Sequence, residues 1–236
     1  MKKTLSLFIA AMMLPLAMTA QARIALVNSQ DIFNAMPEKA AAEAQLQKLS
    51  DEYRAEHLQM QEEFDKKYLV WGSFHDIYIS ELSDDGLSMK NPKVKTKIGG
   101  GAFEGVMIYK HGNYYYLFAS VGTCCEGANS TYRTVVGRST NLTGPYVNKS
   151  GGKMFDNNYT TVIQGNSRWK GTGHNSEIVT DDEGNDWLLY HAYDANNDSK
   201  GRVMLLDKIT WDRSDWPVIS DGTPSTTPQE APVFYK

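Results

Sequence analysis

Two patterns of apolar and polar positions divide the chain, and they meet at residues 67–69. From Glu38 to Lys67, apolar side chains recur mostly at steps of three and four, in a stretch without glycine or proline. This spacing predicts an amphipathic helix of about 30 residues, with Pro37 at its start, where a missing N–H costs nothing. The apolar positions are Ala42, Leu46, Leu49, Tyr53, Met60 and Phe64.

After residue 69 the pattern changes to short apolar or alternating segments separated by turn residues. Such segments predict β-strands, and the last two sets repeat after roughly 70 residues, as successive blades of a β-propeller do. A β-sandwich is the alternative, because it gives the same number of strands with less regularity. The segments are 68–71 and 77–82, then 105–109, 114–120 and 133–139, then 177–180, 187–193 and 203–209.

The N-terminus has the pattern of an export signal. Two lysines precede a short apolar run, and Ala20-Gln-Ala22 matches a cleavage site, so residues 1–22 are predicted to be a signal peptide. The apolar run is too short to span a membrane, and no later run approaches that length. We therefore expect an exported protein, periplasmic or extracellular.

Charge and cysteine content exclude several classes of function. The net charge is −4 and no basic stripe is present, which argues against partners such as nucleic acid and anionic membranes. Cys124 and Cys125 are the only cysteines and are adjacent. Because neighbouring cysteines bridge only through a strained ring, we expect two unpaired thiols in a loop, and no zinc spacing is present.

One candidate for acid chemistry is Glu104, in the motif GGGAFEG that begins at Gly99. A carboxylic acid packed against an apolar ring has a raised pKa, as a general acid requires. A turn residue is the plainer interpretation of a single glutamate. A phosphate-binding loop is excluded, because no Gly-Lys-Ser/Thr follows the glycines.

The second candidate is His174, in the motif GTGHNS that begins at Gly171. The glycines indicate a turning backbone, so His174 is a candidate metal ligand, substrate contact or hydrogen-bonded loop residue. No other ligand stands at metal-binding spacing, which argues against a metal site built from protein groups alone. Residues 194–199 lack the glycine and glutamate of a calcium loop and are interpreted as a turn. Aromatic residues are dense here, and some could stack on sugar rings.

Together these motifs resemble the endo-1,5-α-L-arabinanases of glycoside hydrolase family 43 over residues 68–234. The resemblance implies an incomplete five-bladed β-propeller of about two and a half blades, inverting hydrolysis, and arabinan or arabino-oligosaccharide as the partner. It also implies that Glu104 is the general acid and that His174 belongs to a largely water-coordinated calcium site. The motifs begin at Leu69 (LVWGSF), Gly99 (GGGAFEG), Cys124 (CCEGANSTY), Val136 (VGRS), Leu142 (LTGPY) and Gly171 (GTGHNS).

The resemblance also implies that two carboxylates are missing. In the family, the general-base aspartate and the aspartate that orients the acid fall upstream of Tyr68. Asp31, Asp51 and Asp65 stand in a different sequence context and receive no role. We therefore expect a fragment that keeps its acid without its base and is inactive by itself, with Glu104 and His174 converging on the propeller axis.

Residues 23–67 resemble a different family, the Skp/OmpH periplasmic chaperones, through IALVNSQDIF from Ile24 and MPEKA from Met36. The resemblance includes only the first helix of the family's helical hairpin. The predicted chimera thus has a signal peptide (1–22), a chaperone-like segment (23–67) and a partial propeller (68–236). Periplasmic chaperone and non-catalytic carbohydrate-binding protein are the alternative functions. An exposed blade face or the helix would favour self-association.

Overall fold

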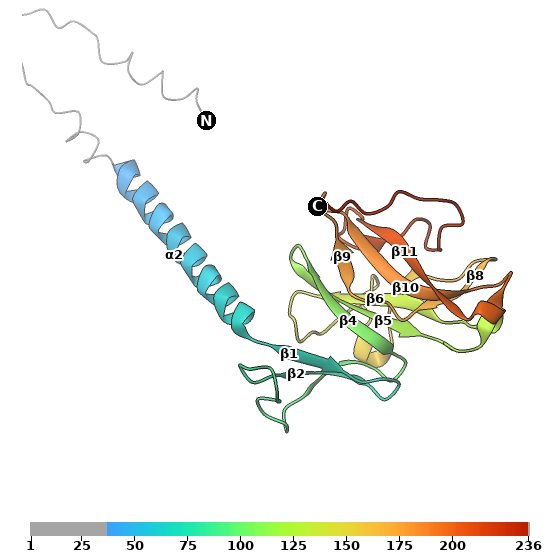
Figure 1. Cartoon of the computed structure of the whole chain (residues 1–236). Coiled ribbons are helices and arrows are strands. Elements are labelled where there is room, and N and C mark those ends of the chain that lie inside the picture. Colours follow the sequence, from blue (N-terminus) through green and yellow to red (C-terminus); the bar gives the residue numbers. More distant parts are fainter. Residues whose placement is uncertain (1–36, 236) are drawn as a thin grey trace, which may run out of the picture. The chain divides into compact units, whose positions relative to one another are not determined.

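A computed structural model describes residues 37–235 of the chain (Figure 1). The predicted signal peptide and the segment 23–36 lie outside these residues. The chain divides into two compact units, Met1–Gln61 and Glu62–Lys236. No helix of the described part combines the length and apolar character needed to cross a membrane.

The predicted long helix is confirmed as α2, Pro37–Asp65. Pairs of side chains four residues apart stabilise its surface, each by a few tenths of a kcal/mol, roughly. Apolar positions of its predicted face are exposed, so local interactions rather than a core account for the described part. The pairs are Lys39–Glu43, Lys48–Glu52 and Gln47–Asp51, and the exposed apolar residues are Leu46, Leu49 and Tyr53.

Three successive antiparallel groups of strands form the second unit (Figure 1). The first is β1 (Tyr68–Trp71), β2 (Ile77–Glu81) and β3 (Thr96–Gly99). The second is β4 (Glu104–His111), β5 (Tyr114–Val121), β6 (Arg133–Ser139) and β7 (Thr160–Ile163). The third is β8 (Trp169–Gly173), β9 (Ile178–Thr180), β10 (Asp186–Asp194), β11 (Arg202–Trp211) and β12 (Pro217–Val218).

The second and third groups meet at one place along their edges. Arg133 of β6 pairs with Thr172 of β8 in parallel, while β8 pairs with β10 in antiparallel fashion. This single parallel pair makes the two groups one continuous nine-stranded sheet. Three short 3-10 turns connect strands: η2 (Gly127–Asn129), η3 (Met154–Asp156) and η4 (Asp198–Lys200).

The alternating side chains of β5 build two separate cores. Tyr116 and Phe118 pack with Leu188 and residues of the third group, whereas Leu117 packs with Ile77 and the first group. Because successive side chains of a strand point to opposite faces, the second group has a core on each side. All five of these residues are fully buried. The mainly β prediction is therefore confirmed, with consecutive groups of strands packed against shared cores.

The prediction of two unpaired thiols is wrong, because Cys124 and Cys125 are joined by a disulfide. Their Cα atoms are 3.8 Å apart, closer than in ordinary disulfides. The pair lies in the β5–β6 connection, between Gly122 (φ 95°) and Gly127 (φ 56°). Positive φ angles are easy for glycine, so the flanking backbone can turn tightly around the pair.

Candidate active site

Glu104 begins β4 and pairs with Ser120 of β5. Its two carboxylate oxygens have different partners. Oε1 accepts a hydrogen bond from the Tyr132 hydroxyl at 2.5 Å, and Oε2 accepts one from the Ser73 hydroxyl at 3.3 Å. The residue before it, Phe103, is completely buried. The carboxyl group is thus held at two points by side chains from two other connections.

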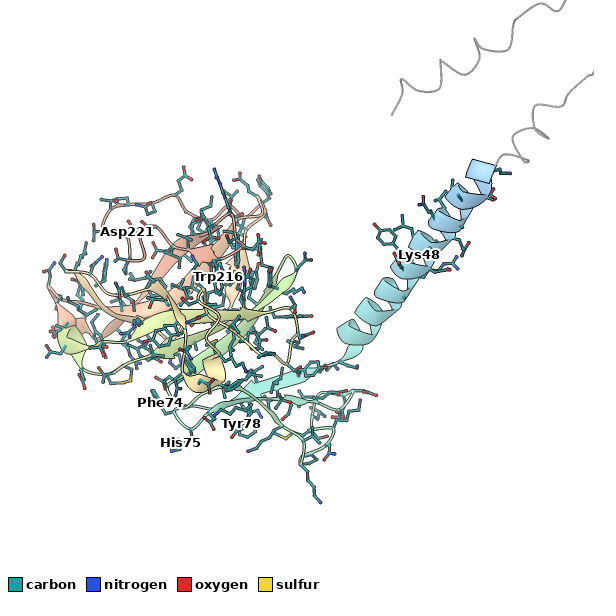
Figure 2. All side chains as sticks on the ribbon, turned by 180° about the vertical axis from the view of Figure 1, so that it is seen from behind. Lys48, Phe74, His75, Tyr78, Trp216 and Asp221 are labelled. Atoms are coloured by element: carbon teal, nitrogen blue, oxygen red, sulfur yellow. A yellow bond between two sulfur atoms is a disulfide. The ribbon has the colours of Figure 1, made fainter. Side chains whose placement is uncertain are left out.

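Ser73 is positioned by the tight turn between β1 and β2, which also contains Phe74 and His75 (Figure 2). Gly72 has φ 127° and Phe74 has φ 52°, so the backbone reverses direction within three residues. The Phe74 amide donates to the Phe103 carbonyl at 2.9 Å. This bond fixes the turn against the residue next to Glu104.

Tyr132 joins Glu104 and His174 into one cluster, although it was not singled out as a site residue from the sequence. Its side chain is 1% exposed, and its hydroxyl contacts both Glu104 and the His174 Nδ1 atom, the latter at 3.3 Å. Burial raises the pKa of the Tyr132 phenol, and the Glu104 carboxylate raises it further. The phenol therefore stays protonated and can donate its hydrogen to Glu104 throughout the physiological pH range.

His174 lies directly after β8 with φ 52°, and this left-handed conformation agrees with the turn in the backbone predicted around it. Its backbone N–H donates to the Ser120 hydroxyl at 2.8 Å. Because Ser120 pairs with Glu104, the same strand position supports both predicted site residues. Glu104 and His174 lie close together, as predicted, because the Tyr132 hydroxyl contacts both side chains.

A second histidine, His191 of β10, completes the cluster. Its ring lies parallel to those of Tyr132 and His174, at 5.8 and 6.1 Å between centroids. Neither ring nitrogen makes a hydrogen bond. Burial lowers the pKa of His191 to about 4, with further lowering by the charge of Arg202 and by His174. The ring is therefore neutral at pH 7.

His174 and His191 line a cavity of about 310 Å³ together with Arg202. Arg202 begins β11, and its side chain is exposed. The remaining walls are mainly apolar, among them Met204, which is 74% exposed. The cavity thus offers a guanidinium and an imidazole beside apolar surface, a combination suited to a polyhydroxyl ligand with apolar C–H faces.

A calcium ion does not fit the described residues alone. Calcium prefers six to eight oxygen ligands, roughly, and the described part of the chain contains no group of three metal-ligating side chains. His174 offers a nitrogen, and both oxygens of Glu104 already accept hydrogen bonds. The calcium site at His174 therefore remains a prediction from the family resemblance.

Among the described residues, Ser73 and Tyr132 are the hydrogen-bond partners of the Glu104 side chain, and neither is a carboxylate. Activation of water on the opposite side of a sugar would require a second carboxylate.

The chain matches one family model and several characterised proteins. The model described as glycosyl hydrolases family 43 matches residues 55–217, beginning within α2. The extracellular exo-α-(1→5)-L-arabinofuranosidase ArbA of Cellvibrio japonicus is 38% identical over 151 residues, which cover 64% of this chain and 40% of that protein. The extracellular endo-α-(1→5)-L-arabinanase 1 of Bacillus subtilis is 42% identical over 118 residues, covering 50% and 34%.

Two solved structures that resemble this chain are also arabinanases. The Cellvibrio cellulosa α-L-arabinanase complexed with arabinohexaose superposes with a TM-score of 0.62 at 34% identity, covering 66% of this chain and 53% of that one. An exo-1,5-α-L-arabinanase from a bovine ruminal metagenomic library gives a TM-score of 0.61 at the same identity, covering 66% and 52%. The chain therefore spans two fifths or less of these curated relatives and about half of these structures.

Proposed function

Because the chain belongs to glycoside hydrolase family 43, we propose that it binds α-1,5-linked arabino-oligosaccharides at the Glu104–Tyr132–His174 cluster. The names of its relatives support this substrate class. The cavity beside His174 supports it independently, since it combines polar groups with apolar walls. The observation that carries the proposal is the shared Tyr132 hydroxyl, which unites the two residues singled out from the sequence.

Glu104 is the proposed general acid of this site. It would donate a proton to the oxygen of the leaving sugar, as one of the two carboxyl groups does in inverting glycosidases. Tyr132 and Ser73 would orient the carboxyl group by their hydrogen bonds. Both partners are held by the backbone around them, so the proton would be presented in one direction.

The chain is further proposed to bind its substrate without hydrolysing it. Inverting hydrolysis requires a base about 6.5–9.5 Å from the acid, with room for water between them. The described residues bring no second carboxylate into the hydrogen-bonded cluster around Glu104. The resemblance places the family's base in sequence upstream of Tyr68, where this chain has α2.

Hydrolysis of linear α-1,5-arabinan by the purified chain tests this proposal. We expect no release of oligosaccharides above that of a Glu104→Gln control, measured by chromatography of the products. Release by the parent that Glu104→Gln abolishes would show a complete catalytic set and contradict the proposed inactivity. Release that both proteins share would indicate a contaminating enzyme, and a repeat after further purification would then decide.

Export to the periplasm or the extracellular space is also proposed. The predicted signal peptide supports it, and the two curated relatives carry the word extracellular in their names. The Cys124–Cys125 disulfide adds an independent argument, because disulfides persist in oxidising compartments. The chaperone alternative rests only on residues 23–67, and the family match and relatives described here give it no support.

A further inference from the structure

The disulfide between Cys124 and Cys125 lies in the connection that leaves the active-site end of the second group of strands. This connection, residues 122–132, begins directly after β5, two residues beyond Ser120. Ser120 pairs with Glu104, and its hydroxyl accepts a hydrogen bond from the His174 amide. At about 3.5 Å per residue, Cys124 lies at most about 14 Å from Ser120.

Hydrogen bonds hold this connection to the centre of the site. The Thr123 carbonyl accepts from the Tyr132 amide at 3.1 Å and from the Ser130 hydroxyl at 2.5 Å. The Thr123 amide in turn donates to the Thr131 hydroxyl at 3.1 Å. Cys124 is therefore one residue from a backbone bond to Tyr132, whose hydroxyl holds Glu104.

A neighbouring connection supports the other side. The Ala128 amide donates to the Asp198 carboxylate at 3.3 Å, which joins η2 to η4 of the β10–β11 connection. The β10–β11 connection leads directly to Arg202, which lines the cavity beside His174. The two connections thus form one rim at the end of the sheets where Glu104 and His174 lie.

Within residues 122–131 of this rim, the disulfide is the main exposed apolar group. Cys125 is exposed and Cys124 is half-buried, while the other residues of 122–131 are glycine, polar residues and the half-buried Ala128. Tyr132, at the end of the connection, is buried, and residues 122–131 contain no aromatic side chain on which a sugar ring could stack. Sulfur is polarisable and apolar in contact, so a disulfide can pack against C–H groups. Its closed ring has little freedom to lose on binding.

We propose that the Cys124–Cys125 disulfide is a binding platform for a sugar unit of the substrate lying beyond the one at Glu104. The inference rests on the proposed function and adds a subsite to it. The apolar C–H face of an arabinose unit packs on the two sulfur atoms, while its hydroxyls face water and the polar residues of the rim. Short ligands that occupy only the Glu104 cluster do not reach the platform.

Calorimetric titration with α-1,5-linked arabinose oligosaccharides, from the disaccharide to the hexasaccharide, tests the platform. The full chain carries Glu104→Gln, so that no ligand is consumed. Replacing both cysteines (Cys124→Ser with Cys125→Ser) is expected to weaken binding of the longer ligands by about tenfold, equivalent to ~1.4 kcal/mol, with the disaccharide unchanged. Reducing the disulfide of the Glu104→Gln chain with a phosphine, with both cysteines kept, is expected to give the same loss and to be reversed by reoxidation.

The matched control is Leu87→Ala, which removes a side chain 87% exposed in the β2–β3 connection. It is expected to leave all affinities unchanged. Equal affinities with and without the disulfide at every length would overturn the inference and leave the proposed function standing. An equal loss at every length would also overturn it, since it indicates damage to the Glu104 cluster. Absence of binding by the parent at all lengths would overturn the proposed function, and the inference with it.

Discussion

At the scale of single residues, the Tyr132 hydroxyl is the contact on which the site depends. Replacing it (Tyr132→Phe) keeps the buried ring but removes the donor to Glu104 and the contact with His174. A half-buried carboxylate then loses its shorter hydrogen bond, so we expect the free energy of unfolding in urea to fall by about 1–2 kcal/mol. Tyr53→Phe on α2 is the control, because Tyr53 is 65% exposed and should change stability by less than about 0.5 kcal/mol.

His191 gives the site a predictable dependence on pH. Its pKa is lowered to about 4 in the folded chain, first by burial and then by Arg202 and His174, against about 6.5 when unfolded. Between these values the unfolded chain binds more protons, so stability falls as the pH drops from about 6.5 to about 4. Because His191 is partly exposed, solvent screening reduces the effect of this pKa difference. We expect the free energy of unfolding to fall by roughly 1–2 kcal/mol over this pH range.

Urea unfolding at pH 7 and pH 4.5 measures this loss by comparison of variants. His191→Gln should reduce the difference in stability between the two pH values, because the depressed titration is gone. His75→Gln should not, since His75 is exposed in the β1–β2 turn (Figure 2). An unchanged difference in His191→Gln would show that the imidazole is not buried as described.

At the scale of elements, β4 offers a matched pair of glycines near its two ends. Gly105 has φ 58° and Gly112 has φ 54°, so alanine is strained at both positions. A Cβ at Gly105 would lie 3.3 Å from His174 Nδ1, whereas at Gly112 it would meet nothing within 4 Å. We expect both Gly→Ala changes to cost about 1 kcal/mol in unfolding free energy. Only Gly105→Ala should also shift the imidazole NMR signals of His174, and an equal shift from Gly112→Ala would contradict this packing.

The accuracy of the strand predictions depended on the pattern of apolar residues in each strand. Strands with several alternating or apolar residues, such as β5 and β10, were predicted almost to their observed ends. By contrast β3, β7, β8 and β12 were missed. They are two to five residues long, too short to show a period, and β8 contains two glycines; only β7, with four β-branched residues, has a strong strand propensity. Long-range pairing decides such strands, and a single sequence does not show it.

The site was predicted only in part for the same reason. Glu104 and His174 stand in glycine-containing motifs that mark a turning backbone, and both lie in the cluster. Tyr132 was missed because it directly precedes the strand pattern of β6, and His191 because it lies within that of β10. Aromatic rings in such patterns usually belong to the core. The Cys124–Cys125 disulfide was missed because its geometry depends on the turn around it, with Gly122 and Gly127 on either side.

At the scale of the whole molecule, the two compact units are expected to be separable. The β unit, Glu62–Lys236, contains both hydrophobic cores and all residues of the candidate site. Deleting residues 1–61 should therefore leave its cooperative unfolding and its affinity for arabino-oligosaccharides within about twofold of the parent. Circular dichroism melting and calorimetry measure both. Loss of folding after the deletion would show that the N-terminal unit is part of the same cooperative structure.

The most direct test of the proposed site is an NMR titration of the intact chain with an α-1,5-linked arabinose trisaccharide, following the imidazole signals of His174 and His191. We expect saturable shifts of both histidines, with the sugar signals showing an intact trisaccharide after prolonged incubation. The shifts should be absent with a xylose trisaccharide of the same length. Unchanged histidine signals would contradict binding at the Glu104–Tyr132–His174 cluster, and the appearance of free arabinose or the disaccharide would contradict binding without hydrolysis.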